Sequence, residues 1–186
     1  MPRVPGGRTR EKTAIPQLIG SLDLKGSLVS VDAIACQLSN ADLIVEKEGH
    51  YPLALKKKNK GVHEQVSQRM QAKKAGLPSA EHVDFGSGRI ERRRCYVESD
   101  LSLYDDLAGW EHLGSIVMVE ASREIGDKTS SETRYCLSDL VLAPDEFNGL
   151  VRGHRRAAPF VAPPVRYALF GHRPCPGPTT HLRYRW

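Results

Sequence analysis

The carboxylate of Asp32 occupies a position in this sequence that favours chemistry. Asp32 directly follows the short apolar run Leu28-Val29-Ser30-Val31, and a segment with helical character begins after it. Because α/β proteins bind ligands and metals in the crevice outside the carboxyl ends of their strands, Asp32 is a candidate catalytic acid and metal ligand. The alternative is that Asp32 only caps the following helix, which is the commoner role of an acid at such a junction.

A second candidate is the cationic run at residues 56–60, which follows another short apolar segment. If the two apolar segments are parallel strands, the lysines leave the sheet at the same edge as Asp32. A lysine at this edge could hold a DNA phosphate as a point charge. The candidate DNA contacts are Lys56, Lys57, Lys58 and Asn59. An ordinary solvated loop is the equally supported alternative.

Hydrophobic periodicity predicts the elements that position these residues. Residues 11–22 carry apolar side chains at spacings of three and four, which predicts an amphipathic helix beginning near Pro16. Residues 27–32 and 51–56 predict strands, and residues 33–48 predict the helix between them. A strand, a helix and a strand at this spacing form a right-handed crossover, so the two strands should be parallel neighbours.

The next part of the chain predicts a helix followed by antiparallel strands. A polar helix is predicted over residues 62–75, a strand over 89–97, and a β-hairpin from 113–121 and 132–138. Arg89, which begins the first of these strands, is a further candidate DNA contact. Since Arg and Glu are mixed on the faces of that strand, an edge strand is the simpler interpretation.

The charge of the chain is concentrated at its two ends. The net charge is +5, yet residues 1–10 hold three arginines and residues 155–186 hold six, with no acid in either segment. Without these nine, 18 basic residues face all 22 acidic ones, so residues 11–154 carry about −4. Any DNA contact in the middle of the chain must therefore come from local patches.

The composition indicates one domain with appendages in a chain of 186 residues, of which 40% are hydrophobic. No apolar run is long enough to cross a bilayer, and the first residues lack the apolar centre of a signal peptide. We therefore expect a cytoplasmic protein with no membrane partner. The four cysteines are far apart and form no C-x-x-C pair, which indicates reduced thiols.

The sequence around Asp32 resembles the DDE transposases of the H-repeat-associated insertion sequences, the ISAs type. The family phrase is typically D-A-M-G-C-Q, which Asp32, Ala33, Cys36 and Gln37 match. Further family phrases are matched in the family's order: L-H-E-x-V at 62–66, with Val62 in place of Leu, and G-H-G-R-I-E-x-R at 86–93, with Ser87 in place of His. S-I-V-x-V-E at 115–120 and E-T-R-Y-x-L-S at 132–138 match in full.

The resemblance implies a partial RNase H-like α/β fold, with parallel strands, a crossover helix and an inserted antiparallel β-hairpin region. It also implies metal-dependent DNA cleavage and strand transfer by three acids that hold Mg²⁺. Asp32 corresponds to the second acid. The family's first acid lies upstream of where Met1 falls, and its third belongs to a phrase beyond the point where the match ends, between His154 and Arg155.

We therefore expect a transposase fragment that is truncated at both ends. Residues 1–10 are predicted to be a disordered lead-in, residues 11–154 a partial catalytic domain, and residues 155–186 an unstructured Pro/Arg-rich tail. A shifted reading frame would explain the abrupt change at Arg155. That hypothesis predicts that another frame of the encoding DNA restores a W-x-x-E-N phrase after His154.

Three functions remain open at this stage. The first is a remnant that is inactive alone, because one Asp cannot fix two cations about 4 Å apart. Candidate replacements for the missing acids are Glu120, Glu124 and Glu132, although their place on the hairpin that the family inserts favours surface residues. The second is a DNA-binding or regulatory fragment that forms a homo-oligomer or associates with full-length transposase. The third is an unrelated Mg²⁺-dependent nuclease that uses Asp32.

Overall fold

The computed structural model describes residues 8–31, 36–57, 60–86, 88–155 and 166–170. The elements in chain order are α1 (Arg8–Ser21), β1 (Ser27–Val31), α2 (Leu38–Glu46), β2 (Pro52–Leu55), α3 (Lys60–Lys73), η1 (Lys74–Gly76), β3 (Ser79–Gly86), β4 (Arg89–Glu98), η2 (Asp105–Leu107), β5 (Ser115–Ile125), β6 (Lys128–Ser138), α4 (Pro144–Arg155) and β7 (Arg166–Phe170).

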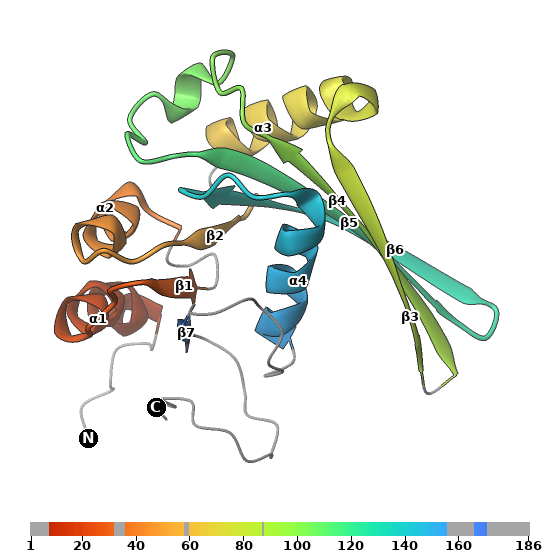
Figure 1. The fold of residues 1–186 in the computed structure, drawn as a ribbon, viewed down its shortest axis with the longest axis horizontal. Coiled ribbons are helices and arrows are strands. Elements are labelled where there is room, and N and C mark those ends of the chain that lie inside the picture. Colours follow the sequence, from red (N-terminus) through yellow and green to blue (C-terminus); the bar gives the residue numbers. More distant parts are fainter. Residues whose placement is uncertain (1–7, 32–35, 58–59, 87, 156–165, 171–186) are drawn as a thin grey trace, which may run out of the picture.

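The strands form one mixed sheet in the order β3-β4-β5-β6-β2-β1-β7 (Figure 1). Neighbours from β3 to β2 pair antiparallel, whereas β1 pairs in parallel with both β2 and β7. The α/β prediction and the parallel β1–β2 pair are confirmed, but antiparallel pairing dominates the sheet. The predicted hairpin of β5 and β6 is also confirmed, and it joins the main sheet because β6 pairs with β2 over Tyr135–Ser138.

Two hydrophobic clusters cover the two faces of this sheet. The larger cluster lies under α1, α2 and α3 and includes Ile19, Ile44, Val66 and Met70, all with 0% exposure. The smaller cluster lies under α4, where Phe147 belongs to the same cluster as buried side chains of β1, β4 and β5 (Figure 1). These strand residues are Leu28, Cys95, Val97, Val117 and Val119. The sheet is therefore a layer between helices, as its apolar strands require.

The strand at residues 89–98 is an inner strand, and its prediction as an edge strand is wrong. β4 pairs with β3 on one side and β5 on the other. Gly88 has a φ of +69°, a conformation that glycine adopts without a steric penalty, and the turn there lets residues 79–86 pair back onto β4. The turn ends of the β3–β4 and β5–β6 hairpins project away from the helices (Figure 1).

The two ends of the described chain differ from the predictions. α1 begins at Arg8 and contains Pro16, so residues 8–10 belong to a helix and not to a lead-in. One proline removes one helical hydrogen bond, while Ile15, Ile19 and Leu22 still bury an apolar stripe. In the tail expected to be unstructured, residues 166–170 form β7, because this β-prone segment pairs with the edge of β1.

A helix was predicted over residues 33–48. The structure has α2 at Leu38–Glu46, and residues 33–35 lie outside the described chain. Among the helices that the structure describes, none combines the length and the apolar character needed to cross a membrane.

Candidate functional site

The candidate site lies at the edge where the parallel strands β1 and β2 end. Val31 is the last residue of β1 and is in register with Leu53 of β2. Asp32, the residue predicted to be the catalytic acid and metal ligand, lies outside the described residues, as do Lys58 and Asn59. The structure therefore defines the strand that leads to Asp32 but tests none of the three assignments.

Lys56 and Lys57 are described, and both are exposed. They follow Leu55 directly, so they leave β2 at the same edge of the sheet at which β1 ends. Exposed Lys60 then begins α3, a helix of 14 residues. These lysines and the helix N-terminus give the edge a locally positive potential, although the middle of the chain is acidic overall.

Arg89 is not part of this edge. Arg89 pairs with Gly86 and Ile125 at the turn end of the hairpins, whereas Leu55 pairs with Tyr135. The register of β5 and β6 places Lys128 opposite Ile125, so the Arg89 level and the Leu55 level are seven β6 residues apart. At about 3.3 Å per residue this separation is about 23 Å.

His63 is a further residue near this edge, in the first turn of α3. Its ring meets Tyr135 edge-on, with 5.4 Å between the ring centroids and 89° between the ring planes. Desolvation lowers the pKa of His63, and the charge of Lys57 lowers it further. His63 is therefore a neutral, half-buried group beside the lysines at neutral pH. The sequence placed His63 in a matching phrase but gave it no role.

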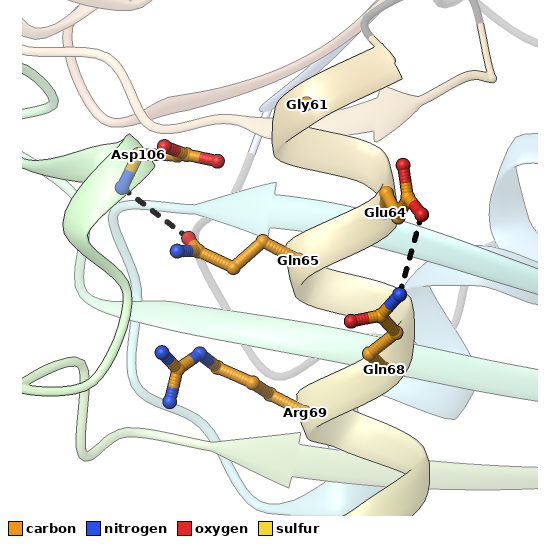
Figure 2. A pocket seen from close by; sticks show the side chains of 6 residues that line it. All are labelled: Gly61, Glu64, Gln65, Gln68, Arg69 and Asp106. Atoms are coloured by element: carbon orange, nitrogen blue, oxygen red, sulfur yellow. Dashed lines mark hydrogen bonds between the residues drawn. The ribbon is translucent and has the colours of Figure 1, made fainter.

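A shallow pocket of about 470 Å³ lies along the next turns of α3 (Figure 2). Gln65 accepts a hydrogen bond from the backbone N–H of Asp106 at 3.3 Å, and Gln68 donates one to Glu64 at 3.3 Å. The guanidinium of Arg69 lies over the ring of Tyr104, 5.8 Å from its centroid. Four of the polar side chains that line this pocket are thus engaged in contacts within the protein, and we assign the pocket no catalytic role.

The acids considered as replacements for missing catalytic acids do not converge. Glu120 binds Lys74 at 2.6 Å on the sheet face covered by α3. Glu132 accepts two hydrogen bonds of 2.7 Å from Arg134, and alternation along the strands places this pair on the opposite face. Within the described part of the chain, no three His, Cys, Asp or Glu side chains form a group that could hold a metal. The described residues alone therefore do not fit a Mg²⁺ site.

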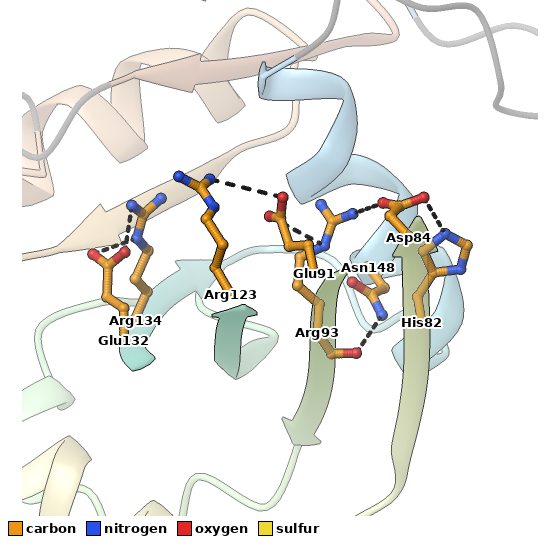
Figure 3. A network of polar contacts seen from close by, with 8 residues as sticks. All are labelled: His82, Asp84, Glu91, Arg93, Arg123, Glu132, Arg134 and Asn148. Carbon is orange, nitrogen blue, oxygen red and sulfur yellow. Dashed lines mark hydrogen bonds and ion pairs between the residues drawn. The ribbon is translucent and has the colours of Figure 1, made fainter. Parts of the chain in front are cut away.

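A network of polar contacts lies on the face of the sheet that α4 covers (Figure 3). Arg93, only 5% exposed, pairs with Asp84 and has Glu91 at 4.0 Å. Glu91 also faces Arg123 at 3.7 Å, and Asn148 of α4 donates to the backbone oxygen of Arg93 at 3.5 Å. The positive and negative charges of this network compensate one another, so this face has no strong positive potential. The contact of Asn148 with β4 helps to hold α4 on the sheet.

No family model and no solved structure matches the chain. An uncharacterized protein in the dhlA 3′ region of Xanthobacter autotrophicus is 37% identical over 139 residues, which is 74% of this chain and 47% of that protein. The "H repeat-associated putative transposase YhhI" of Escherichia coli K12 is 27% identical over 157 residues, which is 79% of this chain and 41% of that protein.

A second H repeat-associated protein of Escherichia coli K12, YbfD, is 41% identical over 49 residues, or 26% of this chain. The chain spans less than half the length of each of these relatives. The chain is therefore similar to H repeat-associated putative transposases, and these matches support the transposase family.

Proposed function

We propose that this chain is the segment of an insertion-sequence DDE transposase that contributes one catalytic acid and contacts DNA. The intact enzyme would cleave DNA and transfer strands with the help of metal ions. The observation that carries the proposal is the parallel pair of β1 and β2, because β1 ends at the residue before Asp32 and Lys56 and Lys57 follow β2 at the same edge. This pair and its helices would be part of an RNase H-like fold.

In the proposed complex, the phosphate backbone of duplex DNA lies against the β1–β2 edge. Lys56 and Lys57 are exposed, so the ammonium group of each is accessible to a phosphate of the DNA. Lys58 and Asn59 are the next two residues in the sequence and are further proposed contacts. Because Arg89 belongs to the turn end of the hairpins, it would contact a different part of the DNA or none.

Asp32 would be one ligand of the Mg²⁺ ions, since carboxylates are the ligands that Mg²⁺ prefers in proteins. When bound, such ions activate a water or a 3′-hydroxyl and stabilise the leaving oxygen. The described acids do not supply further ligands, so the other acids would come from parts of the enzyme beyond the described residues. We therefore expect no strand transfer by this chain alone.

DNA binding by the full chain tests the proposal. Binding of a fluorescent duplex of about 30 base pairs should weaken as salt rises, and a double variant, Lys56→Ala with Lys57→Ala, should lower the magnitude of the log–log salt slope by about 2, since each lost phosphate contact removes about 0.9. The matched control is Lys25→Ala with Lys128→Ala, which removes two exposed lysines away from this edge. Equal losses in both double variants, or no binding, would reject the proposed interface.

A second candidate function is regulation through association with a full-length transposase. The observation that favours it is the similarity to YhhI, which is 27% identical to this chain over 157 residues. A tagged copy of the chain, coexpressed with YhhI, should then retain YhhI during purification and reduce its transposition frequency. Retention with no change in that frequency would contradict a regulatory role.

A further inference from the structure

His63 lies at the same edge of the sheet as the proposed DNA contacts Lys56 and Lys57. It belongs to the first turn of α3, and its ring meets the ring of Tyr135 edge-on, with 5.4 Å between the ring centroids. Tyr135 is in register with Leu55, the residue that directly precedes Lys56. The contact with Tyr135 therefore holds the imidazole at the level where the chain leaves β2 and the two lysines follow.

The imidazole of His63 is held by packing and not by hydrogen bonds. Within the described part of the chain, neither ring nitrogen of His63 has a hydrogen-bond partner. The hydroxyl of Tyr135, the titratable group on β6 beside the ring, instead accepts a hydrogen bond from Gln71 at 3.5 Å. Because His63 is also partly exposed, its ring nitrogens can meet a ligand at this edge.

The charges around His63 are mainly positive. Lys57 follows β2, Lys60 lies three residues earlier on α3, and the helix N-terminus adds a partial positive charge. Glu64, the next residue of α3, is exposed and accepts a hydrogen bond from Gln68 at 3.3 Å. Desolvation and the charge of Lys57 lower the pKa of His63, so the imidazole is neutral in the free chain at neutral pH.

We propose that His63 is a further DNA-binding residue of this edge, one that takes up a proton when a phosphate of the DNA binds beside Lys57. The phosphate supplies a negative charge that offsets the repulsion from Lys57, and it accepts a hydrogen bond from the imidazolium. One proton moves from the solvent to a ring nitrogen, and no other bond forms or breaks. The inference rests on the proposed function, because it requires a phosphate at the β1–β2 edge.

Since proton binding and DNA binding are linked, a lower pH must strengthen DNA binding. Lysine and the phosphates keep their charges between pH 8.0 and 6.0, whereas histidine titrates in this range. Each unit by which the phosphate raises the pKa of His63 makes binding about tenfold tighter at a pH below both pKa values than at a pH above both. We expect a gain of about fivefold or more between pH 8.0 and 6.0, the lower end of ordinary coupling between two ligands.

Titration of the full chain with the fluorescent duplex of about 30 base pairs, at pH 8.0 and at pH 6.0 in the same salt, tests the proposal. His63→Gln keeps a polar side chain that cannot become charged, and it should lose most of the gain in affinity. The matched control is His82→Gln, on β3 at the opposite end of the sheet from β1, which should keep the gain. No gain in the unsubstituted chain, or an equal gain in His63→Gln, overturns the proposal.

The titration of the His63 ring itself separates a charge effect from a packing effect. Followed by its imidazole resonances, His63 should titrate at a higher pH in the chain saturated with duplex than in the free chain. If Lys56→Ala with Lys57→Ala lowers the salt slope while DNA leaves the titration of His63 unchanged, the interface stands and only the role of His63 is refuted. If the full chain binds no duplex, both proposals are refuted.

Discussion

Replacing Phe147 by alanine should markedly lower the free energy of unfolding, because this ring packs α4 against the sheet. Phe147 is 1% exposed and packs in the smaller hydrophobic cluster. Truncation of a buried Phe to Ala removes about 3–5 kcal/mol, which is the sum of the lost transfer free energy and the cavity left behind. Since domains are stable by only about 5–15 kcal/mol, this loss would be a large share of the total free energy of unfolding.

The assay is urea denaturation followed by circular dichroism, with the unsubstituted chain measured beside the variant. The midpoint should fall while the slope with denaturant stays constant, and the melting temperature should fall by about 6–20 °C for a chain of this size. Val141→Ala, at a position 61% exposed in the segment before α4, is the control and should change the unfolding free energy by less than about 0.5 kcal/mol. A decrease of less than about 1 kcal/mol in the free energy of unfolding of Phe147→Ala would refute the packing of α4 on the sheet through Phe147.

Two further predictions concern titratable groups. Burial raises the pKa of the Cys36 and Cys95 thiols to about 12 and of Cys136 to about 11. In Cys175→Ser, alkylation at pH 8 should therefore be at least ~100-fold slower than in urea, and equal rates would contradict this burial. Desolvation and the charge of Lys57 lower the pKa of His63. The contribution of His63 to the free energy of unfolding should therefore be complete above its unfolded pKa of about 6.5 and should decrease as the pH falls below that value. His63→Gln should flatten that decline in denaturation midpoints, and an unchanged decline would contradict the assignment.

The strands with strong local signals could be predicted from the sequence. The apolar run that forms β1 and the turn between β5 and β6, where Gly126 has a φ of +54°, both have local physical causes. β3 was missed because five of its eight residues are exposed and carry no apolar alternation. Its pairing depends on the turn at Gly88 and on the partner strand β4, which are not properties of the segment itself.

The positions of the charged residues could be predicted only in part. Alternation along residues 89–97 places Glu91, Arg93 and Cys95 on one face of the strand, and all three are buried in the structure. The alternation does not reveal the burial of Arg93. That burial arises because α4 covers this face and because Asp84 of β3 compensates the guanidinium charge. In the candidate site, the parallel strands predict the position of Lys56 and Lys57. The separation of Arg89 from these lysines could not be predicted, because it depends on the register of the whole sheet.

In the proposed function, DNA binds to the edge of the sheet where β1 and β2 end. The most direct measurement is a titration of the isotope-labelled chain with duplex DNA, followed residue by residue through amide chemical shifts. We predict that the amides of Lys56, Lys57 and Gly61 shift with one common affinity, while Gly26 and Gly126, in turns away from this edge, do not. Shifts confined to other surfaces, or equal shifts at all five amides, would contradict the claim.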